Sequence, residues 1–261
     1  MLALYHLPMA ICAQKVRVCL AEKDLDWESR IVADLRAPEY LKLNPGGYVP
    51  TLEHAGRLVT ESRIISEYLD EAFGDPSLTP RDPYLRAQMG LWTKLLDEEL
   101  HPNIFILTCA VSLRHWYAAM SPEQRKAALP LDALKRQRAE DIIAHGEESQ
   151  HVMPALRCFV RLVERMEESL KRSSWLAGDT YSLADADYTP YLQRLTDLGL
   201  SFLWRDKPAL SAWVDRVRAR DSFHAAIIKW QPPEHRERAS GVAKRASELF
   251  AAKLASVAPA A

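Results

Sequence analysis

The chain has 261 residues, of which 48% are hydrophobic and 26% are charged, enough to bury one large core or two modest ones. A net charge of −1 argues against broad electrostatic capture of nucleic acid or of an anionic membrane. No apolar run approaches the roughly 20 residues that span a bilayer, and Met1 to Leu7 lacks the basic start and apolar length of a signal peptide, so we expect a cytoplasmic protein.

In chain order, the first part of the sequence predicts alternating strands and helices. Residues 2–32 are typical of a strand, a helix and a second strand. A strand led by Pro50 follows, then a hairpin at residues 54–56, a fourth strand at 57–60 and a helix. The cysteines show no metal-ligand spacing and are expected to be thiols, so no metal site is predicted; they are Cys12, Cys19, Cys109 and Cys158.

The first strand-to-helix turn, residues 6–17, is where we expect chemistry. A thiol or hydroxyl at a helix N-terminus lies near the positive end of the helix dipole, which stabilises a thiolate. His6 is expected at the strand end, facing solvent or ligand. Gln14 and Arg17 are expected to point from the helix toward ligand or a partner subunit.

The most informative segment is Asn44-Pro45-Gly46-Gly47-Tyr48-Val49-Pro50-Thr51-Leu52. Because the Pro50 nitrogen cannot join a ladder, this proline belongs at a sheet edge or strand start, which leaves the Val49 N–H and C=O for a ligand. Further on, Glu61-Ser62 ends a strand and begins a helix, so a hydroxyl and the first helical N–H groups face outward together. Such a terminus is an anion site.

Two domains are predicted, at residues 1–80 and 84–255, because the breaker-rich segment 74–83 reads as a linker and the sequence beyond it has a helical period. Within the helical part, Ser182 and Asp185 form a capping box, which we interpret as structural. Asp187 is either a second buried cap, the interpretation we favour, or a charge at a ligand cleft.

These motifs resemble those of the glutathione transferases, whose N-terminal half is a thioredoxin-like domain and whose C-terminal half is helical. The resemblance implies that Val49, before a cis Pro50, exchanges backbone bonds with the cysteinyl part of glutathione, and that Glu61 and Ser62 hold its γ-glutamyl end. It also implies Arg36, with Lys42 as the alternative, as the basic partner of the glycyl carboxylate. Glutathione is then the co-substrate, and the chain is a homodimer.

The expected catalytic residue is Cys12. Similar bacterial theta-like and zeta-like sequences read Ser-x-Cys-Ser/Ala-Gln-Lys-Val-Arg, in which the first serine donates to the glutathione sulfur. This chain has Ala10 at that place. Cys12 aligns with a cysteine that beta-class members use, so it either forms a mixed disulfide with glutathione or donates to its thiolate, or else it is only a packing residue.

The general layout also resembles the bacterial lignin β-etherases, including a long insertion between residues 100 and 160. The first-turn serine of those enzymes corresponds to Ala13 here. Five aromatic residues could line an acceptor site or belong to the core: Phe105, Trp116, Tyr117, Tyr188 and Tyr191.

We therefore expect a transferase that adds the glutathione thiolate to a hydrophobic, aromatic electrophile in detoxification. A β-etherase, a cysteine-based glutathione-dependent reductase and a non-catalytic glutathione-fold binding protein are the alternatives. The sequence names neither the acceptor nor the transferase class.

Overall fold

The computed structural model describes residues 1–130 and 132–257 and forms two compact units. The first unit comprises Met1–Leu96, Glu168–Leu192 and Ser211–Pro232; the second comprises Asp97–Glu167, Gln193–Leu210 and the described residues from Pro233 onward. These units are made of discontinuous segments, whereas the predicted domains, residues 1–80 and 84–255, divide the chain at a single point. The predicted division stays a prediction.

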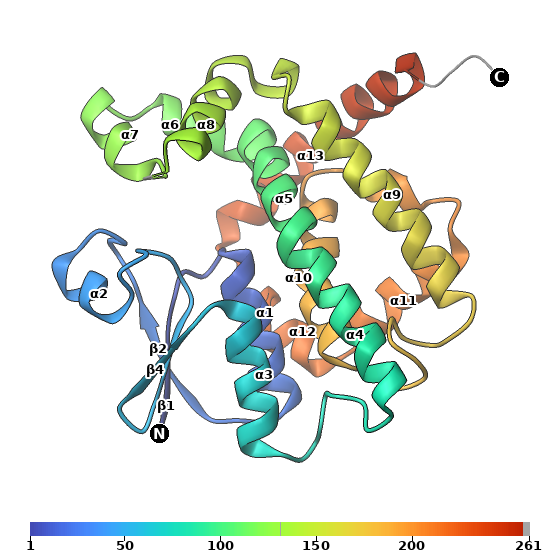
Figure 1. Cartoon of the computed structure of the whole chain (residues 1–261). Coiled ribbons are helices and arrows are strands. Elements are labelled where there is room, and N and C mark those ends of the chain that lie inside the picture. The colour runs from blue at the N-terminus through green and yellow to red at the C-terminus, as the bar shows by residue number, and fades with distance from the viewer. Residues whose placement is uncertain (131, 258–261) are drawn as a thin grey trace. The chain divides into compact units, whose positions relative to one another are not determined.

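A four-stranded mixed sheet organises the first unit (Figure 1). Its strands lie in the order β2-β1-β3-β4 and are β1 (Leu2–His6), β2 (Trp27–Ile31), β3 (Thr51–His54) and β4 (Arg57–Thr60). β1 runs parallel to β2 and antiparallel to β3, which forms a hairpin with β4. At the hairpin turn Ala55 and Gly56 have φ values of 49° and 76°, as a two-residue hairpin loop requires. The predicted strands and hairpin are confirmed.

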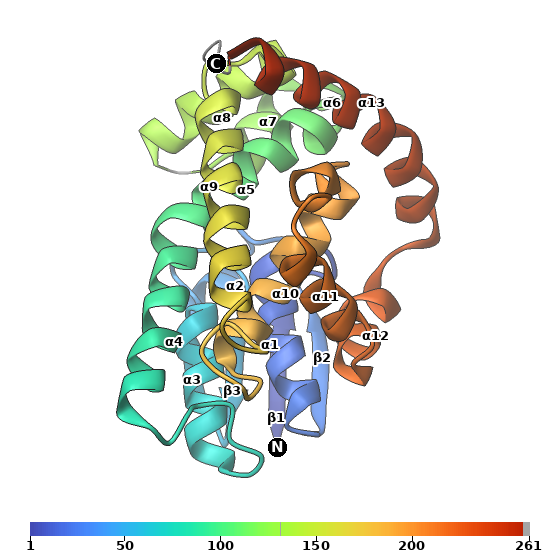
Figure 2. The ribbon, with the colours of Figure 1, turned by 90° about the vertical axis from the view of Figure 1, so that its right-hand side faces the viewer.

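Helices cover both faces of this sheet. α1 (Ile11–Glu22) and α3 (Ser62–Phe73) pack together on one face, and the short α2 (Pro38–Leu43) lies on the other (Figure 1). α1 also packs against α12 (Asp221–Ala226), as Figure 2 shows. Because α1 is covered by other elements on several sides, even its basic residues Lys15 and Arg17 are buried. The predicted thioredoxin-like fold is confirmed.

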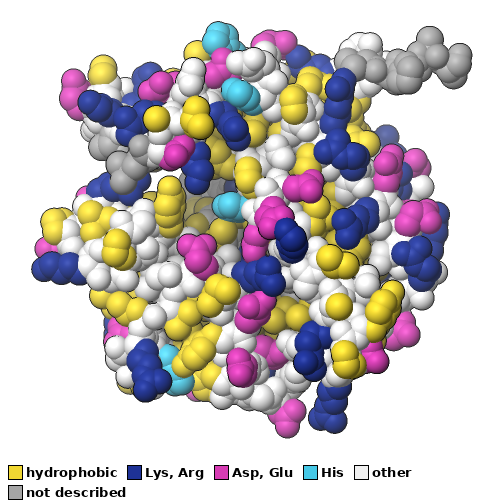
Figure 3. Space-filling view, viewed as in Figure 1, with side chains coloured by type: hydrophobic (Ala, Val, Ile, Leu, Met, Phe, Trp, Pro, Cys, Tyr) yellow, Lys and Arg dark blue, Asp and Glu magenta, His cyan; other side chains and the backbone are white. Residues whose placement is uncertain are grey.

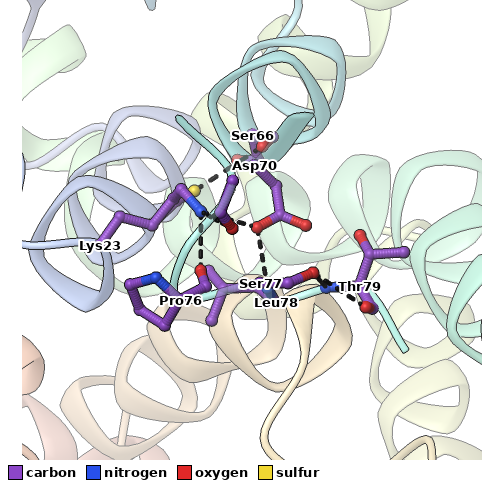
Figure 4. A network of polar contacts seen from close by, with 9 residues as sticks. Lys23, Ser66, Asp70, Pro76, Ser77, Leu78 and Thr79 are labelled. Atoms are coloured by element: carbon purple, nitrogen blue, oxygen red, sulfur yellow. Dashed lines mark hydrogen bonds and ion pairs between the residues drawn. The ribbon is translucent and has the colours of Figure 1, made fainter. Parts of the chain in front are cut away.

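The segment before α4 is tied down by polar contacts rather than left as a loose linker (Figure 4). Asp70 on α3 accepts hydrogen bonds from the Leu78 N–H and from Lys23 Nζ through its Oδ1. Lys23 also donates to the carbonyls of Gly74 and Pro76. The side chain of Leu78 is buried, so the predicted linker is part of the packed unit.

Beyond this segment the described chain is helical, which confirms the predicted helical part. The helices are α4 (Pro83–Leu95), α5 (His101–Thr108), α6 (Arg114–Ala118), α7 (Pro122–Ala128), α8 (Ala133–His145), α9 (Val152–Leu170), α10 (Leu183–Asp197), α11 (Pro208–Arg218) and α13 (Pro233–Val257). Short π-helical turns, η1 (Leu96–Leu100) and η2 (Cys109–Leu113), flank α5. Three 3₁₀ turns complete the set: η3 (Gly146–Glu148), η4 (Ser201–Trp204) and η5 (Ile228–Trp230).

The start of α10 contains one half of the predicted capping box, because Asp185 accepts from Ser182 while the Ser182 hydroxyl donates to that carboxylate instead of accepting the Asp185 N–H. Asp185 accepts the Ser182 backbone N–H at 3.1 Å and its hydroxyl at 3.0 Å. Its other oxygen accepts from the Leu176 N–H and the Trp213 indole. Burial raises the pKa of Asp185, and these hydrogen bonds oppose that rise. The structural interpretation of Ser182 and Asp185 is confirmed.

Acidic and basic side chains are interspersed over the face drawn in Figure 3. This mixture agrees with the net charge of −1. None of the helices that the structure describes is long and apolar enough to cross a bilayer.

Candidate functional site

Four segments of the first unit meet at one end of the sheet. Thr51, at the start of β3, lies opposite both Tyr5 of β1 and Thr60 of β4. β1 and β4 therefore end where β3 begins. β2 ends there as well, since the Val32 N–H donates to the His6 carbonyl at 3.0 Å. The register places the first turn, the residues before Thr51 and the start of α3 next to one another.

The first turn places a thiol at the start of α1. Ala10 is the N-cap residue and, being alanine, supplies no side-chain cap. Cys12 is the second helical residue and is half-buried, whereas Ala13 and the other three cysteines are buried. Among the cysteines, Cys12 is thus the one placed at this site. The first N–H groups of α1 and this thiol are the polar groups that the turn offers.

Val49 and Pro50 lie directly before β3, and the bond between them is cis. The predicted position of Pro50 at a strand start is confirmed, although β3 is an inner strand of the sheet. Neighbouring polar groups are satisfied, since the Tyr48 carbonyl accepts from the Tyr40 hydroxyl and the Asn44 amide. In contrast, the Val49 N–H and C=O form no hydrogen bond with any described residue. They can pair with an extended peptide.

Glu61 and Ser62 form the start of α3. Glu61 is the N-cap residue, has a φ of 66° and has an exposed side chain, and its backbone carbonyl accepts the Ile65 N–H. Ser62 is the first helical residue, and within the described chain its hydroxyl has no hydrogen-bond partner. A hydroxyl and the first amide groups of a twelve-residue helix are therefore directed at one place. This arrangement suits a carboxylate.

Arg36 lies against the same loop. A Cβ on Gly47 would approach Arg36 Nη1 to 2.3 Å, so the guanidinium packs directly over this glycine. Nη1 is buried and has no hydrogen-bond partner among the described residues. A buried cationic donor without an acceptor fits an anionic ligand group. Lys42, the alternative, is exposed on α2.

His6 and Arg17 are placed differently from the prediction. Both side chains are buried, at 0% and 1% exposure, and neither faces solvent. Arg17 Nη1 lies 3.0 Å from His6 Nδ1, and His6 Nε2 lies 2.9 Å from the Ser29 hydroxyl. Because an arginine only donates, Nδ1 accepts and Nε2 carries the proton of a neutral imidazole. Burial, then the Arg17 charge, lowers the pKa of His6 to about 4.

The remaining polar residues of this region are buried. Gln14 is buried, contrary to the expectation that it points to ligand or a partner subunit. Asp187 is also buried, and Lys15 Nζ lies 3.4 Å from its Oδ2. The burial that the favoured interpretation requires is present, but the printed contact of Asp187 is an ion pair, and its role as a second helix cap stays a prediction.

Most of the five aromatic residues are core. Tyr188 and Tyr191 have 0% exposure, and the Tyr188 hydroxyl donates to the Trp92 carbonyl. In the second unit Tyr117 is buried, Phe105 is half-buried and Trp116 is 56% exposed. Phe105 and Trp116 are the members of this set that can still meet an acceptor.

Comparison with known proteins gives a consistent result for both parts of the chain. The model for the N-terminal domain of glutathione S-transferases matches residues 4–77, and the model for their C-terminal domain matches residues 112–221. Protein LigF of Sphingobium sp. strain SYK-6 is 32% identical over 244 residues, which cover 87% of this chain and 93% of that protein. A stringent starvation protein A homolog of Haemophilus ducreyi is 29% identical, with 83% of this chain and 85% of that protein covered.

A solved structure is similar over nearly the same length. The crystal structure described as beta-etherase LigF from the same Sphingobium strain superposes with a TM-score of 0.78 at 29% identity. The match covers 87% of this chain and 99% of that one. The chain is thus similar to it in fold as well as in sequence.

Proposed function

Because the chain belongs to the glutathione S-transferase superfamily, we propose that it binds glutathione at the sheet end described above and transfers the thiolate to a hydrophobic, aromatic electrophile. The observation that carries this proposal is the set of unsatisfied polar groups gathered there. Each of them complements a different part of the tripeptide. Dependence on glutathione is supported at the family level.

The groups match glutathione in charge and in kind. Val49 offers a backbone donor and acceptor to the cysteinyl peptide. The Ser62 hydroxyl and the α3 amides suit the γ-glutamyl carboxylate, and the exposed Glu61 carboxylate suits the ammonium group beside it. The buried Arg36 Nη1 suits the glycyl carboxylate.

With both ends of glutathione held, its sulfur lies at the first turn of α1. Ala10 and Ala13 carry no hydroxyl, so the helix N-terminus and Cys12 are the groups that stabilise the thiolate. The thiolate attacks an electrophilic carbon, the C–S bond forms, and the leaving group departs with the electron pair of its bond to carbon. Fixing the thiolate and the acceptor together supplies much of the rate enhancement.

A β-etherase is the second candidate, supported by the similarity to Protein LigF and to the structure described as a beta-etherase. In this reaction the thiolate attacks the carbon α to a ketone, the carbon–oxygen bond breaks, and an aryloxide leaves and takes up a proton. The same bound glutathione serves both reactions. The acceptor alone differs.

Two further candidates depend on the first turn. The half-buried Cys12 supports a reductase in which its thiolate attacks the glutathione sulfur of a mixed disulfide and expels the second thiol as a thiolate, which takes up a proton. A second glutathione then attacks the disulfide on Cys12 and leaves as oxidised glutathione, which restores the thiol. The absence of a hydroxyl on Ala10 supports a binding protein without catalysis. A cytoplasmic, detoxifying homodimer remains part of the main proposal.

A substrate panel distinguishes these candidates once calorimetry has established glutathione binding. The panel consists of a chlorinated nitroarene, a β-aryl ether ketone and a glutathione mixed disulfide. Turnover of the nitroarene supports the transferase, release of a phenol supports the etherase, and disulfide exchange supports the reductase. Binding without turnover of any of the three supports the binding protein, and no binding rejects the proposal.

A further inference from the structure

Arg17 differs from the other charged residues of α1 discussed above in having no carboxylate partner among the described residues. Lys15 pairs with Asp187, and Glu22 accepts two hydrogen bonds from Arg220. Lys23, directly after the helix, pairs with Asp70. Arg17 lies between these pairs, yet no carboxylate of the described residues is within ion-pair distance of it. The helix therefore carries one buried positive charge that no described carboxylate compensates.

The Arg17 guanidinium is held by neutral groups. Its Nη2 donates to the Pro8 carbonyl at 2.7 Å, and its Nε donates to the Ala226 carbonyl at 2.8 Å. The ring of Trp230 covers it, with the ring centroid 5.0 Å from the guanidinium carbon. These partners satisfy its donors but do not cancel its charge. A buried cation is costly, so a site that retains one uses its charge, its donors or both.

The guanidinium also lies at the turn that receives the glutathione sulfur. Pro8 belongs to that turn, in which the Ala10 N–H donates to the Leu7 carbonyl. We propose that Arg17 is an electrostatic residue of the reaction, whose buried charge lowers the pKa of the thiol bound at the first turn. This inference rests on the proposed function, and it assigns to a charge beneath the turn part of the role that a hydroxyl on residue 10 would have.

The ionisable groups around Arg17 leave its charge in place. His6, in contact with it, is neutral at physiological pH. Burial lowers the pKa of Arg17 to about 9, so the guanidinium stays protonated at neutral pH. On α12, Asp221 and His224 are exposed, as is Lys229 on η5. From α3 and α10 the carboxylates facing α1 are Asp70 and Asp187, each with its own lysine.

The test separates charge from hydrogen bonding. Arg17→Gln removes the charge and keeps donors, whereas Arg17→Lys keeps the charge. The pKa of bound glutathione is read from the ultraviolet absorbance of its thiolate. We expect Arg17→Gln to raise this pKa by about one unit, the order expected for a unit charge roughly 10 Å away at an effective dielectric constant of about 20. Arg17→Lys should stay close to the wild-type value.

The kinetics should follow the same pattern. At pH values below the raised pKa of bound glutathione, Arg17→Gln should lower the conjugation rate by up to about 10-fold. Above that pKa the rate of the variant should return to nearly the wild-type value. Arg57→Gln, which removes an exposed cation on β4, is the matched control and should change neither quantity. If the pKa of bound glutathione shifted equally in Arg17→Gln and Arg17→Lys, or in neither, the inference would be overturned. Arg17 would then have a structural role only, through its hydrogen bonds to the Pro8 and Ala226 carbonyls.

Two additions keep the test decisive. If Arg17→Gln does not fold, a synthetic segment of residues 1–18 carrying citrulline at position 17 can be ligated at Cys19, which replaces the guanidinium by a neutral group of the same shape. If wild-type protein binds no glutathione, the proposed function fails. The pH dependence of Cys12 alkylation then still reports the Arg17 charge, because the other cysteines are buried. An unchanged Cys12 pKa in the neutral variant would reject the inference by itself.

Discussion

Lys23 and Asp70 form a buried ion pair, with Nζ 2.9 Å from Oδ1, and the same oxygen accepts the Leu78 N–H (Figure 4). The pair joins the end of α1 to α3 and to the segment before α4. Residues 74–83 are rich in glycine and proline, which disfavour helices and strands, yet these contacts fix the path of the backbone there. A pair with this many neighbours contributes to stability mainly through the cost of leaving one partner behind.

Lys23→Met should therefore lower the free energy of unfolding by about 3–5 kcal/mol, because the buried Asp70 carboxylate would lose its cation. Urea denaturation measures this change. Lys171→Met, which breaks an exposed pair with Glu168, is the control and should leave the midpoint nearly unchanged. A Lys23→Met midpoint equal to that of the control would contradict the prediction.

Ser62→Ala should weaken glutathione binding by about 1–3 kcal/mol while the fold stays intact, because a hydroxyl and helix amides are expected to share one carboxylate. Isothermal titration calorimetry measures the affinity. Ser66→Ala, on the same helix but buried one turn further on, provides the comparison and should bind like the wild type. Unchanged affinity in Ser62→Ala would remove this residue from the site.

Cys12→Ala should abolish thiol–disulfide exchange and lower conjugation by no more than about 10²-fold, since the helix terminus and the positioning of glutathione survive. Bound glutathione should also block alkylation of Cys12. Steady-state rates on the three substrate classes check both effects. If the mutant kept wild-type rates on all of them, Cys12 would be a packing residue.

The chain should form a two-fold homodimer through α3 and α4, where Ile64, Tyr84 and Leu91 are 50%, 68% and 49% exposed. Light scattering at micromolar concentration should return twice the 29.6 kDa mass of one chain. Leu91→Arg should shift the mass toward the monomer. Leu134→Arg, at an exposed leucine of α8, should not. A single-chain mass for the wild type would reject the dimer.

Acid should destabilise the fold through His6. Its pKa is about 4 in the folded state against about 6.5 when unfolded, so below pH 6.5 the unfolded chain binds a proton that the folded chain does not. The stability is complete above about pH 6.5 and falls by at most about 3 kcal/mol as the pH drops to 4. His6→Phe should flatten this part of the profile in urea denaturation at several pH values. A wild-type slope equal to that of the mutant would contradict it.

Local chemistry explains which parts of the fold were predictable. The hairpin, the strand start at Pro50 and the helix start at Ser62 each depend on a few adjacent residues, so their sequence signals suffice. His6 and Arg17 were mispredicted because their surroundings come from Ala226 and Trp230, about 200 positions later. No local pattern reveals that α12 and η5 pack against α1 and against the side chains of His6 and Arg17.

The same limit applies to the binding residues. The resemblance already favoured Arg36 over Lys42, and the structure adds that the Arg36 guanidinium lies over Gly47 whereas Lys42 is exposed. The positions of the five aromatic residues could not be predicted either, because helical spacing does not distinguish a tyrosine in the core from one at a pocket. The catalytic role of Cys12 stays a prediction, as do the roles in glutathione binding of Val49, Pro50, Glu61, Ser62 and Arg36.

The rings around Arg17 give the protein an optical reporter. Trp27 and Trp230 stack with centroids 5.7 Å apart, and each lies edge-on to His6, at 5.5 Å and 4.9 Å. Indole emission responds to nearby charge, and these two indoles flank a buried imidazole and a buried guanidinium. Once the other five of the seven tryptophans are replaced by phenylalanine, the intrinsic fluorescence can therefore follow electrostatic change beneath the first turn in real time.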